Sequence, residues 1–165
     1  MFRAKHIDGD EMARIMVVDD TYFMRALIKA ILKQAGHEVV AEARDGDEAL
    51  KNYMIYKPDL VTMDITMYGM NGIDAVKAII SMDKTAKIIM ISAMSQKSMV
   101  IGAIRNGAKH FIIKPVTVEK VVGVIDQVLG IKTKSSNGND DFSGIKQSIE
   151  EMEKAIVEID ENGTK

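Results

Sequence analysis

Four short apolar runs in this chain each end in side chains that can do chemistry. Asp19 and Asp20 end the first, Asp64 the second, Ser92 the third and Lys114 the fourth. Carboxylates brought close together repel and raise one another's pKa unless a cation joins them. Mg²⁺, a hard ion that prefers oxygen ligands and keeps several waters, is the natural partner for such a group. Lys114 adds a fixed positive charge beside Asp64.

Phosphoryl transfer onto a carboxylate requires a metal cation and an ammonium group beside that carboxylate. The carboxylate acts as the nucleophile, and both cations neutralise charge on the phosphoryl oxygens. Lys114 cannot be a metal ligand while it is protonated. Asp64 is the candidate nucleophile, because it ends a run with the length of a buried strand and a glycine-containing stretch, residues 68–72, follows it.

Each of these residues also has an ordinary structural interpretation. Asp64 can be a turn or N-cap residue, and Asp19 and Asp20 can be a capping pair. Ser92 can be a turn residue, and Lys114 a solvated strand end. The chemical interpretation is favoured because all five fall at strand ends that a parallel sheet brings to one edge.

The elements that position these side chains alternate along the chain as five repeats of a strand followed by a helix. Such alternation with short loops predicts a parallel sheet with right-handed crossovers and helices on both faces. The sequence therefore predicts an α/β fold, a doubly wound, five-stranded, flavodoxin-like (βα)5 domain. The predicted strands are residues 14–20, 37–43, 59–64, 87–92 and 109–114, and the predicted helices are residues 21–35, 46–56, 71–82, 96–106 and 118–129.

Apolar spacing along each helix predicts which residues face the sheet. These residues are Phe23, Leu27, Ala30 and Ile31 in the first helix, Ala49, Leu50, Tyr53 and Met54 in the second, Ile73, Val76, Ala78, Ile79 and Ile80 in the third, Met99, Val100, Ala103 and Ile104 in the fourth, and Val121, Val122, Ile125 and Val128 in the fifth.

Composition sets limits on the function. The 165 residues are 47% apolar and 28% charged, which suits one domain with an extension. A net charge of -2 gives no argument for nucleic-acid binding. The absence of cysteine excludes a disulfide scaffold, a thiol nucleophile and a thiolate metal site. No apolar run suits a secretory signal or a membrane span, so no membrane insertion and a cytoplasmic location are expected.

Charge and composition divide the chain. Residues 1–132 carry a net charge of +2, from 18 basic and 16 acidic side chains, and residues 133–165 carry -4, from 4 and 8. We predict a flexible arm (1–13), the main domain (14–131), a polar linker (132–141) and an acidic amphipathic C-terminal helix (142–160). That helix either packs on its own domain or frays, or it supports a weak dimer or docks on a partner.

The chain resembles a receiver domain of two-component signalling, specifically a chemotaxis response regulator of the CheY type. The resemblance spans residues 14 to 129. The stretches that carry it are Ile15–Asp20, Phe23-Met24-Arg25, Val39–Ala43, Pro58–Met67, Met70–Ile73, Lys87–Met94, Ser98–Ile101, Gly107-Ala108-Lys109 and Lys114-Pro115.

The resemblance implies a role for each residue of the acidic group. Asp64 accepts the phosphoryl group from a kinase phosphohistidine. Asp20, Asp64 and the main-chain oxygen of Thr66 bind Mg²⁺ directly, and Asp19 holds a metal-bound water.

The resemblance also implies how the site signals. Lys114 contacts the phosphoryl group and precedes a cis proline. Ser92 moves toward the phosphoryl group and forms a hydrogen bond to it, and the Phe111 side chain then swings inward. The implied partners are a chemotaxis histidine kinase, the flagellar motor switch protein and a phosphatase. A protein of this kind catalyses only its own phosphorylation and dephosphorylation and is not a turnover enzyme.

Three residues depart from the family pattern. Tyr68 stands where proline is usual, which puts the loop geometry and the dephosphorylation rate in doubt. Phe111 replaces a common tyrosine, so no hydroxyl can report its swing to a partner. Val116 follows Pro115 where an aromatic residue is frequent.

Other functions remain open at this stage. A phosphohydrolase of the haloacid dehalogenase kind also uses an Asp nucleophile, Mg²⁺ and Lys, but it needs a second acid where this chain has Thr66. A receiver of another phosphorelay, a truncated transcriptional regulator and an unphosphorylated structural module are further alternatives. The 33 residues after position 132 are too few and too acidic for a DNA-binding domain.

Overall fold

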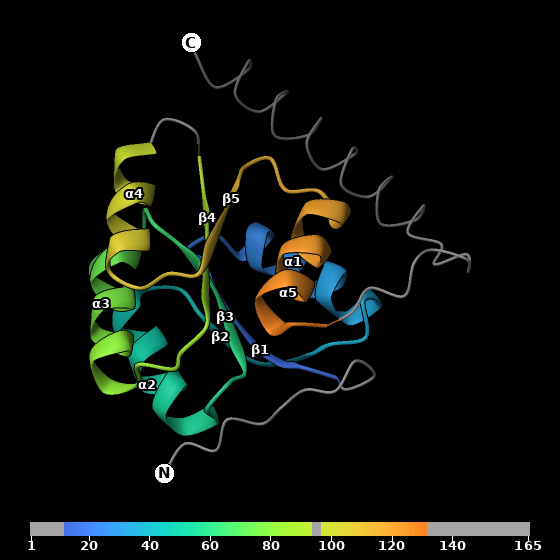
Figure 1. Ribbon diagram of the computed structural model, residues 1–165, viewed down its shortest axis with the longest axis horizontal. Helices are drawn as coiled ribbons and strands as arrows, with labels where there is room; N and C mark the ends of the chain where they lie inside the picture. Colours follow the sequence, from blue (N-terminus) through green and yellow to red (C-terminus); the bar gives the residue numbers. More distant parts are fainter. Residues whose placement is uncertain (1–11, 94–96, 132–165) are drawn as a thin grey trace.

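Five parallel strands form one sheet between two layers of helices in the computed structural model, which describes residues 12–93 and 97–131 (Figure 1). The strands are β1 (Arg14–Val18), β2 (Glu38–Ala43), β3 (Leu60–Asp64), β4 (Ile88–Ser92) and β5 (His110–Ile113), and the helices are α1 (Tyr22–Gln34), α2 (Gly46–Tyr56), α3 (Gly72–Met82), α4 (Lys97–Arg105) and α5 (Val118–Leu129). The predicted doubly wound α/β fold is confirmed.

The strand order β2-β1-β3-β4-β5 decides which strand ends are neighbours. Val18 at the end of β1 pairs with Met63 of β3, so Asp19 and Asp64 follow on adjacent strands. Asp64 pairs in turn with Ile91 of β4, next to Ser92. The topology therefore gathers the predicted side chains at the carboxyl edge of the sheet.

Both faces of the sheet are buried, which explains why the strands read as continuous apolar runs. Alternate residues of a strand point to opposite faces. Ile15 and Val17 pack with α1 and α5 on one face. Met16 and Val18 pack on the other, against α2, α3 and α4. Figure 1 shows these two helical layers on either side of the sheet.

The observed elements lie within two residues of the predicted ranges. β1 ends at Val18 rather than at Asp20, and β5 ends at Ile113 rather than at Lys114. The chemical side chains therefore sit just beyond the strands, where the backbone is no longer tied into the ladder.

Several predicted inward positions are wrong. Ala30, Met54 and Ile104 are exposed, Met54 at 55%. In α1 the buried positions are instead Ile28 and Leu32, together with the correctly predicted Leu27 and Ile31. Spacing alone gives a stripe about 100° wide, and the sheet decides which edge of that stripe is covered. Met99 of α4 is also exposed, at 37%.

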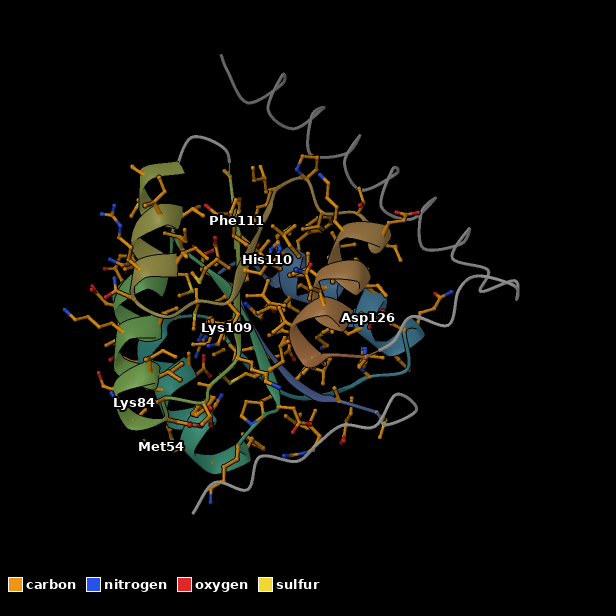
Figure 2. The ribbon with its side chains drawn as sticks, in the orientation of Figure 1. Met54, Lys84, Lys109, His110, Phe111 and Asp126 are labelled. Atoms are coloured by element: carbon orange, nitrogen blue, oxygen red, sulfur yellow. The ribbon has the colours of Figure 1, made fainter. Side chains whose placement is uncertain are left out.

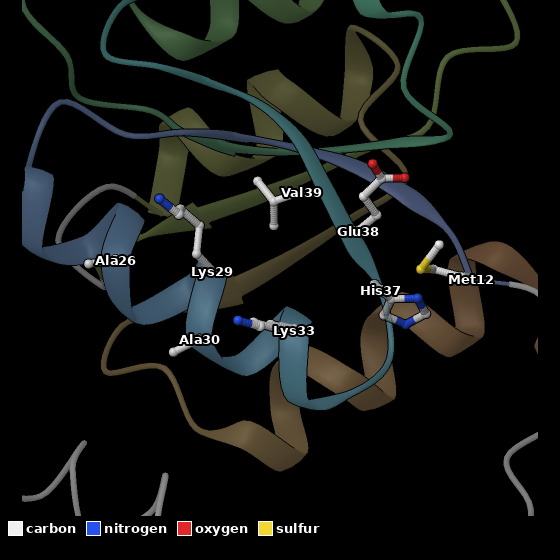
Figure 3. Close-up of a pocket in the computed structure, with 8 residues that line it drawn as sticks. All are labelled: Met12, Ala26, Lys29, Ala30, Lys33, His37, Glu38 and Val39. Carbon is white, nitrogen blue, oxygen red and sulfur yellow. The ribbon is translucent and has the colours of Figure 1, made fainter.

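A hollow of about 580 Å³ lies between α1 and β2, and the exposed Ala30 is part of its lining (Figure 3). Ala26 and Ala30 line it from α1, and Val39 lines it from β2. His37 and Glu38, at the start of β2, also line it. The hollow thus lies toward the amino ends of the strands, away from the acidic group.

Part of the predicted domain plan lies outside the described residues. This applies to the linker, the acidic C-terminal helix and residues 1–11 of the arm. Ala13, predicted as the last residue of the arm, is fully buried, and its main-chain oxygen accepts a hydrogen bond from the Glu38 N–H. Within the ranges that the structure describes, no helix is long and apolar enough to cross a bilayer.

Gly72 closes the loop that follows Asp64. Its N–H donates to the Ile65 oxygen at 2.8 Å, and a Cβ at this position would overlap the main-chain oxygen of Asp64.

We expect Gly72→Ala to destabilise the fold by roughly 3 kcal/mol in urea unfolding, because the backbone must shift. Gly123→Ala is the matched control: a Cβ there has nothing within 4 Å inside α5, so stability should rise by about 0.5–1 kcal/mol. Equal stability of both variants would contradict the prediction.

Candidate functional site

Three aspartates converge at the carboxyl edge of the sheet. Asp19 and Asp20 follow β1, and Asp64 ends β3. Each offers a carboxylate oxygen, and these atoms all lie within 4.8 Å of one another. Asp19 and Asp64 are buried, with 1% and 5% exposure, whereas Asp20 is exposed. Two acceptors are thus enclosed by the fold, and the third faces solvent.

Lys114 reaches into this group from the end of β5. Its Nζ lies 3.3 Å from Oδ2 of Asp19 and 3.6 Å from Oδ1 of Asp64. The peptide bond from Lys114 to Pro115 is cis, as the resemblance implied. The predicted pairing of an ammonium with Asp64 is therefore present, and Asp19 shares it.

Asp19 is held on its other oxygen by Thr21. The Thr21 N–H and Oγ1 both donate to Asp19 Oδ1, each at 2.9 Å. Thr21 occupies the N-cap position of α1, but its side chain makes no capping hydrogen bond. The Thr21 hydroxyl therefore fixes the acidic turn and not the first turn of α1.

Burial and mutual repulsion disturb the acidity of the group. The pKa of Asp64 is raised to about 6, mainly by desolvation and then by repulsion from Asp19 and Asp20, and Lys114 opposes this rise. The pKa of Asp20 is also raised, first by desolvation and then by Asp19. A carboxyl with a raised pKa beside an ammonium, at an open sheet edge, is typical of a functional site.

The donor set fits a hard divalent cation. Carboxylate oxygens are the ligands that Mg²⁺ prefers, and one exposed member leaves room for metal-bound water. A cation would also relieve the repulsion that raises the pKa of both Asp20 and Asp64. Both carboxylate oxygens of Asp19 already have partners, Thr21 at Oδ1 and Lys114 at Oδ2, so Asp20 and Asp64 are better suited to direct contact with the ion.

The remaining predicted site residues differ in how far they are buried. Ser92 is fully buried at the end of β4, and its Oγ donates to the Ala93 oxygen at 3.3 Å. Thr66 is exposed two residues after Asp64. Tyr68 points to solvent with 92% exposure, and Phe111 is 38% exposed in β5. Figure 2 labels Phe111 beside His110 on β5, and the ring of Phe111 is not enclosed in the core.

Sequence reasoning missed two charged residues next to the site. Arg25 of α1 donates from Nη1 to the main-chain oxygen of Asp19 at 2.8 Å. Its Nε lies 3.4 Å from Oε1 of Glu42 in β2. Arg25 belongs to the Phe23-Met24-Arg25 stretch that carries the family resemblance, and no local pattern links it to Glu42, 17 positions later.

The raised pKa of Asp64 makes stability depend on pH. Because the folded pKa of about 6 exceeds the 3.8 of an unperturbed aspartate, the stability that the protonated carboxyl contributes is full below about pH 4 and is lost as pH rises through 6. Asp64→Asn removes this loss. In urea unfolding without metal, the free energy of unfolding of Asp64→Asn should exceed that of wild type by about 2–3 kcal/mol at pH 8, and the difference should close toward pH 4. The same gap at both pH values would contradict this prediction.

Comparisons with known proteins agree with the geometry. A family model described as the response regulator receiver domain matches residues 15–126. The chain is 53% identical over 115 residues to chemotaxis protein CheY of Thermotoga maritima, which covers 70% of this chain and 96% of that protein. It is 54% identical over 116 residues to CheY of Bacillus subtilis, covering 70% and 97%.

Solved structures agree as well. A CheX–CheY–BeF3–Mg²⁺ complex from Borrelia burgdorferi contains a chain 36% identical to this one, with a TM-score of 0.68 and coverage of 70% of this chain and 88% of that chain. The response regulator domain of Thermotoga maritima CheB is also 36% identical, with a TM-score of 0.64 and coverage of 73% and 96%. This chain therefore belongs to the response regulator receiver domain family of two-component systems, with CheY among its relatives.

Proposed function

We propose that this protein is a cytoplasmic, phosphorylation-dependent chemotaxis response regulator whose phosphoacceptor is Asp64. The observation that carries the proposal is the placement of Lys114 Nζ 3.6 Å from Asp64 Oδ1, inside a group whose three carboxylates lie within 4.8 Å. Two relatives that are about 50% identical to this chain, and that match it over nearly their whole length, are chemotaxis proteins. This similarity supports the chemotaxis assignment.

The proposed reaction is phosphoryl transfer to a carboxylate oxygen of Asp64. That oxygen attacks the phosphorus of a kinase phosphohistidine, the P–N bond breaks, and the imidazole nitrogen keeps the electron pair. Lys114 stabilises negative charge on the phosphoryl oxygens. Asp20, Asp64 and the main-chain oxygen of Thr66 would hold Mg²⁺, with Asp19 acting through a water, and the bound ion would supply further charge neutralisation. Hydrolysis by water returns the carboxylate and releases inorganic phosphate.

The signal is proposed to leave through the surface formed by α4, β5 and α5. Phosphorylation replaces the single negative charge of the Asp64 carboxylate with a phosphoryl group that carries nearly two. Ser92, at the end of the neighbouring strand, follows the phosphoryl oxygens, and Phe111 moves from its half-exposed position toward the space this opens. Large apolar side chains are exposed on α4 and β5: Met99 at 37%, Ile101 at 50%, Ile104 at 40% and Phe111 at 38%. A partner that prefers the altered surface shifts the equilibrium.

The proposed partners are a chemotaxis histidine kinase as phosphodonor, the flagellar motor switch protein as target, and a phosphatase. The Borrelia burgdorferi relative was solved in complex with CheX. We propose no substrate turnover beyond the protein's own phosphorylation and dephosphorylation. Tyr68, which extends into solvent four residues after Asp64, is placed to affect how quickly the phosphoryl group is lost.

A phosphodonor experiment tests the central proposal. The full chain is incubated with a small phosphodonor and Mg²⁺, and its intact mass is measured. One added phosphoryl group is expected with Mg²⁺, and much less when EDTA removes the metal. No mass gain under any metal condition would refute the function.

A second experiment separates chemotaxis from other two-component outputs. Motor-switch protein is used as bait, and capture of the full chain is compared with and without phosphodonor. Stronger capture after phosphorylation is expected. Phosphorylation without any change in capture would favour a receiver of another pathway.

The acidic segment 142–160 is proposed to support a weak dimer, through the apolar positions Ile145, Ile149, Met152, Ile156 and Ile159. Sedimentation of the full chain is compared with that of an Ile149→Asp, Ile156→Asp variant. A concentration-dependent mass above the monomer for wild type alone is expected, and identical masses would retire the idea.

A further inference from the structure

Arg25 holds the backbone from which the acidic turn begins. Its Nη1 donates to the main-chain oxygen of Asp19 at 2.8 Å, while the Asp19 N–H donates to the Ala43 oxygen of β2 at 3.0 Å. The Asp19 oxygen lies in the peptide plane that joins Asp19 to Asp20, and that plane is rigid. Fixing this oxygen therefore restrains where the N and Cα of Asp20 lie, and so the point from which its side chain departs.

Arg25 is itself oriented by its contact with Glu42 of β2. Its Nε lies 3.4 Å from Glu42 Oε1, and Lys29 Nζ holds Glu42 Oε2 at 3.0 Å. The ring of Tyr22 lies 5.9 Å from the guanidinium carbon. The Arg25 side chain is only 15% exposed, against 39% for Lys29. The planar guanidinium donates in two directions at once, which an ammonium group on a flexible stem does less well.

Asp20 is the acidic side chain that most depends on such support. Asp19 is fixed by Thr21 and Lys114, and Asp64 is enclosed at the end of β3. Asp20 is exposed, and it follows Asp19, whose N–H makes the hydrogen bond to Ala43 of β2. Its approach to Asp64 is therefore set mainly by the turn.

We propose that Arg25 is a positioning residue that sets the affinity of the acidic group for a divalent cation, by holding the Asp19 carbonyl so that Asp20 faces Asp64. This inference rests on the proposed function, because it assumes that Asp20 and Asp64 bind Mg²⁺. Groups that hydrogen-bond behind metal ligands commonly tune metal affinity without touching the ion. Arg25 extends that role to a main-chain oxygen, and it connects the site to the edge strand β2 through Glu42.

Lys29 provides a matched control, because it contacts the same Glu42 but does not reach Asp19. Mg²⁺ binding to the full chain is measured by calorimetry or amide NMR for wild type, Arg25→Gln, Arg25→Lys and Lys29→Gln. Arg25→Gln should bind Mg²⁺ roughly tenfold more weakly, and Lys29→Gln should stay close to wild type. Arg25→Lys should remain weakened, because it restores the charge but not the two-directional contact.

Urea unfolding without metal shows whether each variant is folded under the titration conditions. If Arg25→Gln is not, Glu42→Gln is the second variant: it removes the charge that orients Arg25 and should weaken Mg²⁺ binding in the same direction, by a smaller factor. Wild-type affinity in both the Arg25→Gln and Glu42→Gln variants would overturn the inference. Equal loss in Lys29→Gln, or full recovery in Arg25→Lys, would also overturn it. If wild type binds no Mg²⁺, the proposed function fails first and the inference with it, independently of any variant.

Discussion

Asp64→Asn should take up no phosphoryl group under conditions in which the wild-type protein gains one. An amide oxygen is a poor nucleophile, and the substitution keeps nearly the same volume in a position that is 5% exposed. The rest of the acidic group, including the contact between Lys114 and Asp19, should remain. Intact mass after incubation with a small phosphodonor and Mg²⁺ measures the effect directly.

Asp59→Asn is the matched control for this loss. Asp59 lies just before β3, at the opposite edge of the sheet, and its Oδ2 accepts the Arg14 N–H at 2.8 Å. An asparagine oxygen can keep that hydrogen bond, so the fold and the uptake should both be retained. Continued phosphorylation of Asp64→Asn would mean that another residue is the acceptor.

Lys114→Gln should slow phosphorylation of Asp64 by roughly a hundredfold, because it removes a preorganised cation from the reacting group. The ammonium lies 3.6 Å from Asp64 Oδ1 and is the cation that lowers the pKa of that carboxyl. The substitution also removes the charge that lowers the pKa of Asp64, so part of the loss at pH 7 comes from protonation of that carboxyl. The loss that persists at pH 9 measures the missing stabilisation of negative charge during transfer.

Lys109→Gln is the control for Lys114→Gln. Lys109 is exposed and lies just before β5, at the end of the strand opposite to Lys114. Figure 2 labels it on the side of His110 that is away from Phe111. Its substitution should leave the phosphorylation rate unchanged. Rates are measured from the mass gain over time at pH 7 and pH 9. If pH 9 restored Lys114→Gln fully, protonation and not charge stabilisation would be the cause.

Many features of this protein could be predicted from its sequence because they are local. Strands buried on both faces must be apolar throughout, so the runs that end at Val18, Asp64, Ser92 and Ile113 were visible without a structure. Strand-helix alternation requires parallel pairing, which places all their carboxyl ends at one edge. The candidate site residues follow from these two facts together.

Other features depend on how the strands pair, which sequence spacing does not contain. The order β2-β1-β3-β4-β5 makes β1 and β3 neighbours, and this brings Asp19 and Asp64 to the same ammonium. It also places Glu42 of β2 beside Arg25 of α1.

The sequence by itself determined which side chains reach the edge of the sheet, because residue type and periodicity act along the chain. The tertiary structure alone decided how far each carboxylate is withdrawn from water. That withdrawal raises the pKa of Asp64, since a charge is less stable where protein replaces solvent. It also decided that Ala30 faces outward, since packing against the sheet selects one edge of an apolar stripe that spacing leaves too wide.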